Sequence, residues 1–209
     1  MAEHLVVVDY GSGNIRSVVN ALERVSPPGH HVRVSQDPKE LSQADRLILP
    51  GVGAFSECKR KLGDSQFLEA LKSFKETERP FLGICVGMQI LAEEGEEFTP
   101  TRGLGWLKGR VRRLQPKDPK TKLPHVGWSL ITPKPHPLFD GIPEKSRFYF
   151  VHSYILYGLP DADIAASAHY GEDFAAAVIQ GSILGCQFHP EKSDKVGLQI
   201  LSNFCKWKP

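Results

Sequence analysis

Apolar residues in the first half of the chain follow two alternating patterns. Short apolar runs, typical of strands buried on both faces, cover residues 5–8, 46–49 and 81–84, and a further short strand is expected over residues 31–35. Stretches with the spacing of amphipathic helices cover residues 15–25, 58–76 and 87–94. Because strand and helix patterns alternate, we predict an α/β fold with an open, twisted, mostly parallel sheet and helices on both faces.

After residue 103 the pattern changes to short strands separated by turns. The expected strands cover residues 109–114, 146–156, 165–169, 175–180 and 182–188, and a helix over residues 195–206 follows them. We interpret these strands as antiparallel additions packed on the first half. The 209 residues, 41% of them hydrophobic, are enough for one sizeable core, so we expect residues 1–209 to form a single domain.

Composition and charge exclude several function classes. A net charge of +2 gives no argument for nucleic acid as a partner. Residues 108–122 carry seven basic side chains against one acid, but interleaved apolar residues favour a strand with a solvated face. Nothing in the sequence resembles a signal peptide and no apolar stretch approaches membrane-spanning length, so we expect no membrane partner. Four scattered cysteines lack metal-ligand spacing, so we expect no metal, no cofactor and a reducing, cytoplasmic setting.

Cys85 is the first candidate for chemistry. It lies between Gly83 and Gly87, where an apolar strand pattern passes into a helical one. Glycines permit a sharp strand-to-helix turn that exposes the side chain at its tip, as in a nucleophile elbow. The sulfur then lies at a helix N-terminus, which favours the reactive thiolate. The alternative, a buried cysteine between packing glycines, stays open on these residues alone.

His189 and Glu191 supply the groups that a cysteine nucleophile needs. An apolar strand pattern ends at His189, where Pro190 stops the ladder. Residues two apart on an extended segment point the same way, so Glu191 can orient the imidazole. A thiol, an imidazole and a carboxylate are the nucleophile, base and orienting group of covalent acyl transfer.

An oxyanion pocket is the remaining requirement. The backbone N–H of Val86, directly after the nucleophile, is one natural donor. A second donor is expected from the string Pro50-Gly51-Val52-Gly53, because it follows a strand of the kind that ends beside Cys85. An ordinary tight turn is the alternative there. Gly11-Ser12-Gly13 also suggests a dinucleotide loop, but Arg16 replaces the third glycine of that motif.

Three strings resemble the signatures of class I glutamine amidotransferases, the family with a catalytic triad. They are GICVGMQ at residues 83–89, PGVG at 50–53 and QFHPEKS at 187–193. Within that family, DYGSGN at 9–14, HVGW at 125–128 and YFVHSY at 149–154 resemble the glutaminase subunits of imidazole glycerol phosphate synthases. Two departures are Val86, where leucine is common, and Ser129, where the family usually carries asparagine.

The resemblance implies hydrolysis of L-glutamine for histidine biosynthesis. Cys85 would attack the side-chain amide, with His189 and Glu191 completing the triad. The family places substrate-binding groups at positions matching Gln89, Glu97, Ser153 and Tyr154. The resemblance further implies a heterodimer with a TIM-barrel cyclase subunit, which receives the ammonia through a channel and makes imidazole glycerol phosphate and AICAR. Candidates for the docking face are Asn14, His125, Trp128 and Lys192.

Three other functions are compatible with some of these residues, and each differs from the glutaminase in a feature that can be tested. A glutaminase subunit serving anthranilate, aminodeoxychorismate or pyridoxal phosphate synthesis would share the triad, whereas HVGW and YFVHSY favour the histidine pathway. A γ-glutamyl hydrolase or cysteine peptidase would not release ammonia from glutamine. A non-catalytic scaffold would not need an intact set of Cys85, His189 and Glu191.

Overall fold

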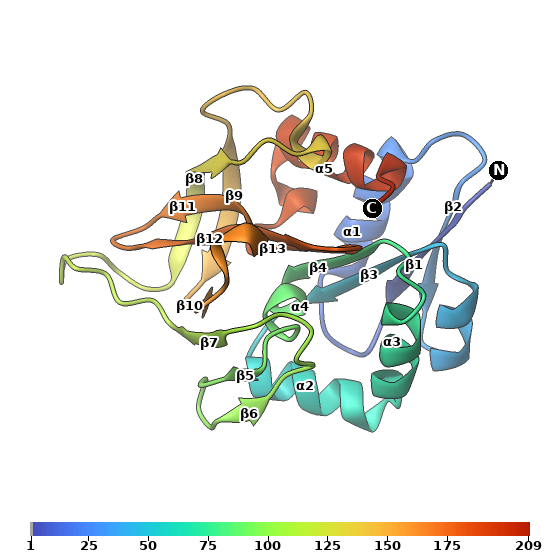
Figure 1. Cartoon of the computed structure of the whole chain (residues 1–209), viewed down its shortest axis with the longest axis horizontal. Helices are drawn as coiled ribbons and strands as arrows, with labels where there is room; N and C mark the ends of the chain where they lie inside the picture. Colours follow the sequence, from blue (N-terminus) through green and yellow to red (C-terminus); the bar gives the residue numbers. More distant parts are fainter. Residues whose placement is uncertain (1) are drawn as a thin grey trace.

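A nine-stranded sheet crosses the computed structural model, which describes residues 2–209 (Figure 1). Its strand order is β2-β1-β3-β4-β13-β12-β11-β8-β9. The first five are parallel: β2 (His31–Ser35), β1 (His4–Val8), β3 (Arg46–Gly51), β4 (Phe81–Cys85) and β13 (Ile183–Cys186). The others run antiparallel to their neighbours: β12 (Asp173–Gln180), β11 (Ile164–His169), β8 (His125–Pro133) and β9 (Arg147–His152). The predicted α/β fold, with antiparallel strands added in the second half, is confirmed.

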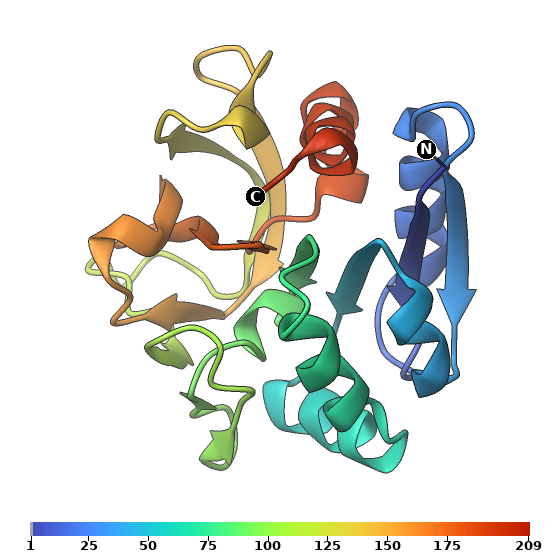
Figure 2. The ribbon, with the colours of Figure 1, turned by 45° about the vertical axis from the view of Figure 1, so that its right-hand side comes forward.

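Helices cover both faces of the parallel half. α1 (Ile15–Val25) and α5 (Asp194–Lys206) pack against each other on one face, and α2 (Phe55–Asp64) and α3 (Phe67–Lys75) cover the other (Figures 1 and 2). Short 3-10 helices connect the elements: η1 (Pro38–Gln43), η2 (Pro137–Phe139), η3 (Asp161–Asp163) and η4 (Pro190–Lys192). Because the strands between these helices are buried on both faces, they read as continuous apolar runs.

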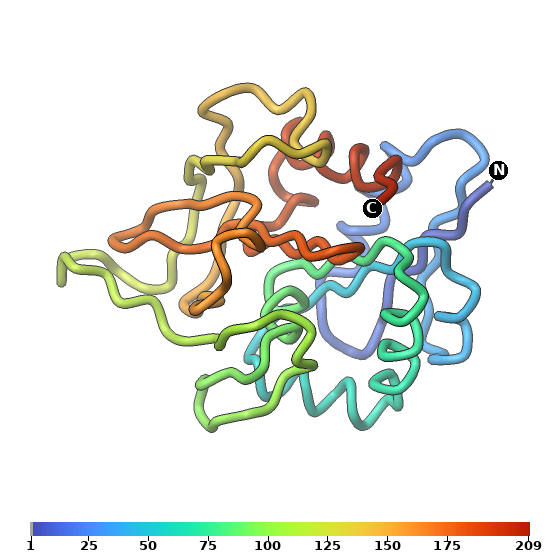
Figure 3. The backbone as a smooth tube through the Cα atoms, in the orientation of Figure 1, coloured from blue at the N-terminus to red at the C-terminus, as the bar shows by residue number. Residues whose placement is uncertain are grey.

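A second, four-stranded sheet packs beside the large one. Its order is β10 (Tyr154–Tyr157), β7 (Arg110–Arg113), β5 (Glu94–Gly95) and β6 (Thr101–Arg102). The backbone trace in Figure 3 shows that the connection from β7 to β8 extends well away from the body of the molecule. Among residues 2–209, no helix combines the length and apolar character needed to cross a membrane.

Several elements differ from the sequence prediction, and the short strands β5 and β6 were not predicted. The helix expected over residues 87–94 is α4 (Val86–Gln89), because the carbonyls of Ile90, Leu91 and Ala92 accept from backbone amides of residues 104–107 instead of continuing the helix. The helical stretch 58–76 is divided into α2 and α3 by Gln66, whose φ is 61°. The strand expected over residues 146–156 breaks at Ser153 into β9 and β10, which belong to different sheets. β8 was not predicted.

Candidate active site

Cys85 lies at the sharp turn between β4 and α4. Its φ of 54° and ψ of −112° are unusual for a residue with a side chain. Backbone strain of this kind persists only where the surroundings enforce it, and it clusters at functional sites. The turn brings α4 against the end of β3, where a Cβ on Gly51 would lie 2.6 Å from the Gly87 nitrogen. Only glycine at both positions permits this approach.

Strand β13 brings the second half of the chain to the same place. It pairs in parallel with β4, with Cys186 opposite Ile84, while β3 pairs on the other side of β4 with Gly51 opposite Cys85. The carboxyl ends of three neighbouring parallel strands therefore meet at Cys85. His189 follows β13 directly, which is why a residue over a hundred positions away lines the same cavity as the cysteine.

Glu191 holds His189 from one side of the ring. Its Nδ1 is 2.8 Å from Oε1 of Glu191, and both side chains are almost completely buried. That leaves Nε2 as the ring nitrogen available to Cys85. Burial opposes protonation of the ring, but hydrogen bonds and charges from Cys85 and Glu191 outweigh it and raise the pKa of His189 to about 10. The imidazole is therefore arranged to carry a proton next to Cys85.

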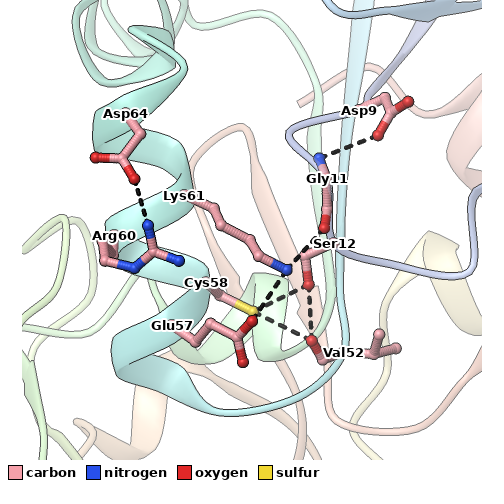
Figure 4. A network of polar contacts seen from close by, with 9 residues as sticks. All are labelled: Asp9, Gly11, Ser12, Val52, Glu57, Cys58, Arg60, Lys61 and Asp64. Carbon is pink, nitrogen blue, oxygen red and sulfur yellow. Dashed lines mark hydrogen bonds and ion pairs between the residues drawn. The ribbon is translucent and has the colours of Figure 1, made fainter.

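A glycine loop, residues 50–53, borders Cys85 from the β3 side. The carbonyl of Val52 accepts hydrogen bonds from Oγ of Ser12 at 2.7 Å and from the thiol of Cys58 at 3.3 Å. Figure 4 shows these two side chains converging on Val52, while Lys61 joins the Gly11 carbonyl to Glu57. Side chains outside the cavity thus set the orientation of the glycine loop.

A cavity of about 280 Å³ opens beside the cysteine. Among its lining residues are Val52, Gly53, Cys85, Val86, Gln89, Glu97, Ser153, Tyr154 and His189. Of the residues expected around the substrate, Gly51 and Glu191 do not line the cavity but contact residues that do.

Several polar groups around this cavity already form hydrogen bonds within the protein. Gln89 donates from Nε2 to the Tyr154 carbonyl and to Oε1 of Gln187, each at 2.9 Å, so its amide oxygen is the group left for a ligand. Glu97 accepts from the backbone N–H of Phe55, at the start of α2. The Ser153 carbonyl accepts from the N–H of Leu114. The carbonyls of Ser153 and Tyr154 are therefore not free acceptors.

Two residues near the cysteine and histidine were missed in the sequence. Gln187 is fully buried, and its Nε2 lies 3.7 Å from the Cys85 sulfur. Ser193 donates to the His189 carbonyl and accepts from the N–H of Tyr149, which fixes the backbone of His189 against β9. Both belong to the string QFHPEKS, so their position beside His189 was the available signal.

The four residues expected on a docking face do not all reach the surface. Trp128 is 46% exposed, Lys192 is exposed and Asn14 is half-buried. His125 is only 1% exposed, and its ring stacks on Tyr170 at 3.9 Å between ring centroids. The expectation for His125 as a direct docking contact is therefore wrong, because its side chain points inward from β8.

No cluster of three or more histidine, cysteine or acidic side chains within residues 2–209 is arranged to hold a metal ion. The four cysteines, Cys58, Cys85, Cys186 and Cys205, are buried free thiols. The groups around the cavity are thus a thiol, an imidazole–carboxylate pair, amides and backbone groups. These are the functional groups that covalent acyl transfer requires.

Comparison with known proteins gives consistent matches over nearly the whole chain. The sequence profile of the family Glutamine amidotransferase class-I matches residues 6–207. Imidazole glycerol phosphate synthase subunit HisH of Brucella abortus (strain 2308) is 45% identical over 214 residues, which cover 98% of this chain and 99% of that protein. The protein of the same name from Cereibacter sphaeroides is 46% identical, with the same two coverages.

Solved structures share the fold at low sequence identity. The structure of PurLQS from Thermotoga maritima is similar with a TM-score of 0.76 and 19% identity, over 99% of each chain. A glutamine amidotransferase from Thermotoga maritima has a TM-score of 0.63 and 16% identity, over 91% of this chain and 77% of that one. At this level of identity the likeness shows the fold alone.

Proposed function

The chain belongs to the class-I glutamine amidotransferases, and we propose that it is the glutaminase subunit of an imidazole glycerol phosphate synthase. It hydrolyses L-glutamine to glutamate and ammonia and passes the ammonia to a cyclase subunit. The relatives of that name, 45% and 46% identical over almost their full length, support the assignment. Residues 1–209 act as one amidotransferase domain, in keeping with a family match over residues 6–207.

The observation that carries the proposal is the cavity that Cys85 and His189 line together, with Glu191 bonded to the far side of the imidazole. In the proposed mechanism the Cys85 sulfur attacks the carboxamide carbon of glutamine. Backbone N–H groups of Val86 and of the glycine loop stabilise the oxyanion. His189 gives its proton to the departing ammonia and then activates water against the glutamyl thioester. Glu191 stabilises the charged imidazole throughout.

Glutamine would be bound by polar groups around the same cavity. The amide oxygen of Gln89, the carboxylate of Glu97 and the backbone at Ser153 and Tyr154 are the proposed contacts. Glu97 is well suited to the substrate's ammonium group, because it is a carboxylate fixed in position by its bond to the Phe55 N–H.

The partner is proposed to be a TIM-barrel cyclase, as the strings HVGW and YFVHSY suggest. The docking face is the outer side of β8 and β9, where Val126, Trp128 and Leu130 are exposed. Trp128 packs on Tyr149, and the Lys192 ammonium lies 5.9 Å from the Tyr149 ring centroid. Val151, opposite Val126, also lines the cavity, so this face leads to the place where ammonia forms. A reducing cytoplasm suits four free thiols.

The deciding experiment measures glutamate and ammonia release from glutamine, with and without the cognate cyclase and its nucleotide ligand. We expect the pair to release ammonia and to form imidazole glycerol phosphate. Cys85→Ala should abolish glutamine-dependent synthesis while synthesis from added ammonium salt persists, because the cyclase site is untouched. Ammonia release that survives Cys85→Ala, or a chain that cannot restore growth to a histidine auxotroph, would contradict the proposal.

A further inference from the structure

A buried chain of hydrogen bonds runs from strand β8, next to the edge of the large sheet, to the Cys85 sulfur. Ser129 Oγ lies 2.8 Å from Nε2 of His125, and Nδ1 of His125 lies 3.0 Å from Nε2 of His152. Nδ1 of His152 lies 3.0 Å from the Tyr154 carbonyl, which also accepts from Gln89. Gln89 then reaches Gln187, and Gln187 reaches the sulfur.

One group in this chain fixes the direction of all the others. The Tyr154 carbonyl can only accept, so Nδ1 of His152 must carry the ring proton. Burial lowers the pKa of His152 to about 3 and that of His125 to about 4, so both rings are neutral near pH 7. Nε2 of His152 is then an acceptor, His125 must donate to it from Nδ1, and the Ser129 hydroxyl donates to His125.

The same carbonyl orients the two glutamines. Gln89 must turn its NH₂ group toward Tyr154, and that group also meets Gln187 at 2.9 Å. The atom of Gln187 in this contact must therefore be its oxygen. Its NH₂ group is left to face Cys85, at 3.7 Å from the sulfur. The amide of Gln187 cannot flip without placing two donors, or two acceptors, against each other.

We propose that Gln187 is a fixed N–H donor to the Cys85 thiolate, oriented by Gln89, and that Ser129, His125 and His152 are positioning residues that hold the Tyr154 carbonyl to which Gln89 donates. This inference rests on the proposed function, since it gives the cysteine of that reaction a stabilising partner other than His189. A donor held in place before reaction needs no reorganisation when charge develops. Gln187 is fully buried, so water cannot replace it there.

Other groups also act on the sulfur and must stay constant in a test. The titratable side chains near it are His189 with Glu191 behind it, His152 and Glu97 around the cavity, and Tyr10 and Cys186 from neighbouring strands. Substitution at Gln187 leaves all of them in place. A change in thiolate reactivity can then be assigned to the missing N–H group.

The test is the pH profile of Cys85 alkylation by iodoacetamide, followed by mass mapping of the labelled peptide. Gln187→Met removes the donor at similar length, and we expect the midpoint of the profile to rise by about one pH unit, the size of a hydrogen bond to a charged group. Gln187→Leu removes the donor with a second apolar side chain of a different shape, adds no titratable group, and should shift the midpoint equally. Gln199→Met, on α5 and bonded to Asn203, is the matched control and should not shift it.

A folded Gln187→Met or Gln187→Leu protein whose midpoint coincides with the wild type overturns the role of Gln187. Imidazole nitrogen NMR tests the positioning role of the histidines: His125 and His152 should both be neutral with the proton on Nδ1. A His152 proton on Nε2 alone would remove its bond to the Tyr154 carbonyl and overturn that positioning role. Neither measurement uses glutamine. A chain that failed to hydrolyse glutamine yet showed the alkylation shift would therefore disprove the proposed function alone.

Discussion

The most constrained residue is Cys85, whose backbone conformation costs roughly 1–3 kcal/mol. What maintains it is the close packing of glycines around the turn. A Cβ on Gly83 would lie 2.8 Å from the Gly87 carbonyl oxygen, and one on Gly87 would overlap the Leu49 carbonyl oxygen. The glycines of GICVGMQ are therefore explained by backbone contacts, and the strained cysteine is supported from both sides of the turn.

Gly87→Ala should be severely damaging. The added methyl group must push α4 away from β3, which we expect to cost about 3 kcal/mol of unfolding free energy and to displace Cys85. Gly63→Ala is the matched control, because its Cβ would meet only Leu68 at 3.8 Å near the end of helix α2, and it should be neutral or stabilising. Urea unfolding of both variants checks this. Equal stabilities would mean that the turn is not sterically limited.

Because His125 and His152 are buried, we expect the free energy of unfolding to fall as the pH is lowered. Both rings titrate near 6.5 in the unfolded chain, whereas burial lowers the pKa of His152 to about 3 and that of His125 to about 4. Below about pH 6.5 the unfolded chain therefore binds more protons, so stability falls as the pH drops toward 4. The loss is on the order of 3 kcal/mol for each ring.

His152→Gln should flatten this acid dependence, because it removes one of the two rings. The readout is the urea midpoint as a function of pH, compared with wild type between about pH 7 and 4. His169→Gln changes an exposed histidine and should leave the wild-type slope intact. A His152→Gln profile parallel to the wild type over that window would show that His152 does not lose its proton on folding.

Between elements, one buried cation fastens the C-terminal helix to the sheet. Arg46, at the start of β3, is 3% exposed and donates from Nη1 to the carbonyls of Phe204 and Trp207, each at 2.7 Å. Its Nε bonds to Glu3 at 2.6 Å. A cation at the carboxyl end of α5 satisfies carbonyls that the helix leaves unbonded.

Arg46→Met should lower the free energy of unfolding by about 3 kcal/mol, because it leaves these carbonyls and Glu3 without their donor. Arg60→Met breaks an exposed pair with Asp64 within α2 and should cost less than about 1 kcal/mol. Chemical denaturation of the two variants gives the comparison. A similar small loss for both would show that Arg46 does not anchor α5.

Elements with a strong local pattern were predictable, whereas those set by distant partners were not. The range predicted for α1 matches the structure, and those for β1, β3 and α5 are within two residues, because each presents a clear apolar run or stripe. The short α4 depends on amides from residues 104–107, and the break at Ser153 depends on two different sheets. Neither cause is visible in local sequence. At the site, Cys85 and His189 were predictable from their turn and strand end. The string QFHPEKS pointed to Gln187 only as a neighbour of His189, because its distance to Cys85 is set by the pairing of β13 with β4.

In the whole molecule, the alternating side chains of β8 give the residues of the string HVGW two different roles. Side chains alternate along a strand, so His125 and Ser129 point inward while Val126 and Trp128 point outward. The inward side begins the hydrogen-bond chain to Cys85, and Ser129 supplies a hydroxyl donor where the family usually has an asparagine amide. The outward side forms the proposed docking face. One strand thus serves the cavity with one face and the partner with the other.

Substitution of the exposed tryptophan on β8 tests the proposed docking face. Trp128→Ala should weaken association with the cyclase by about 30-fold, since a half-exposed tryptophan beside Tyr149 is the kind of anchor that dominates interfaces. Tyr157→Ala is the matched control, because Tyr157 is 58% exposed on β10 of the other sheet and should leave the affinity unchanged. Titration calorimetry measures both. Loss of affinity in Tyr157→Ala but not in Trp128→Ala would move the docking face to the small sheet, and ammonia would then need a different exit from the cavity.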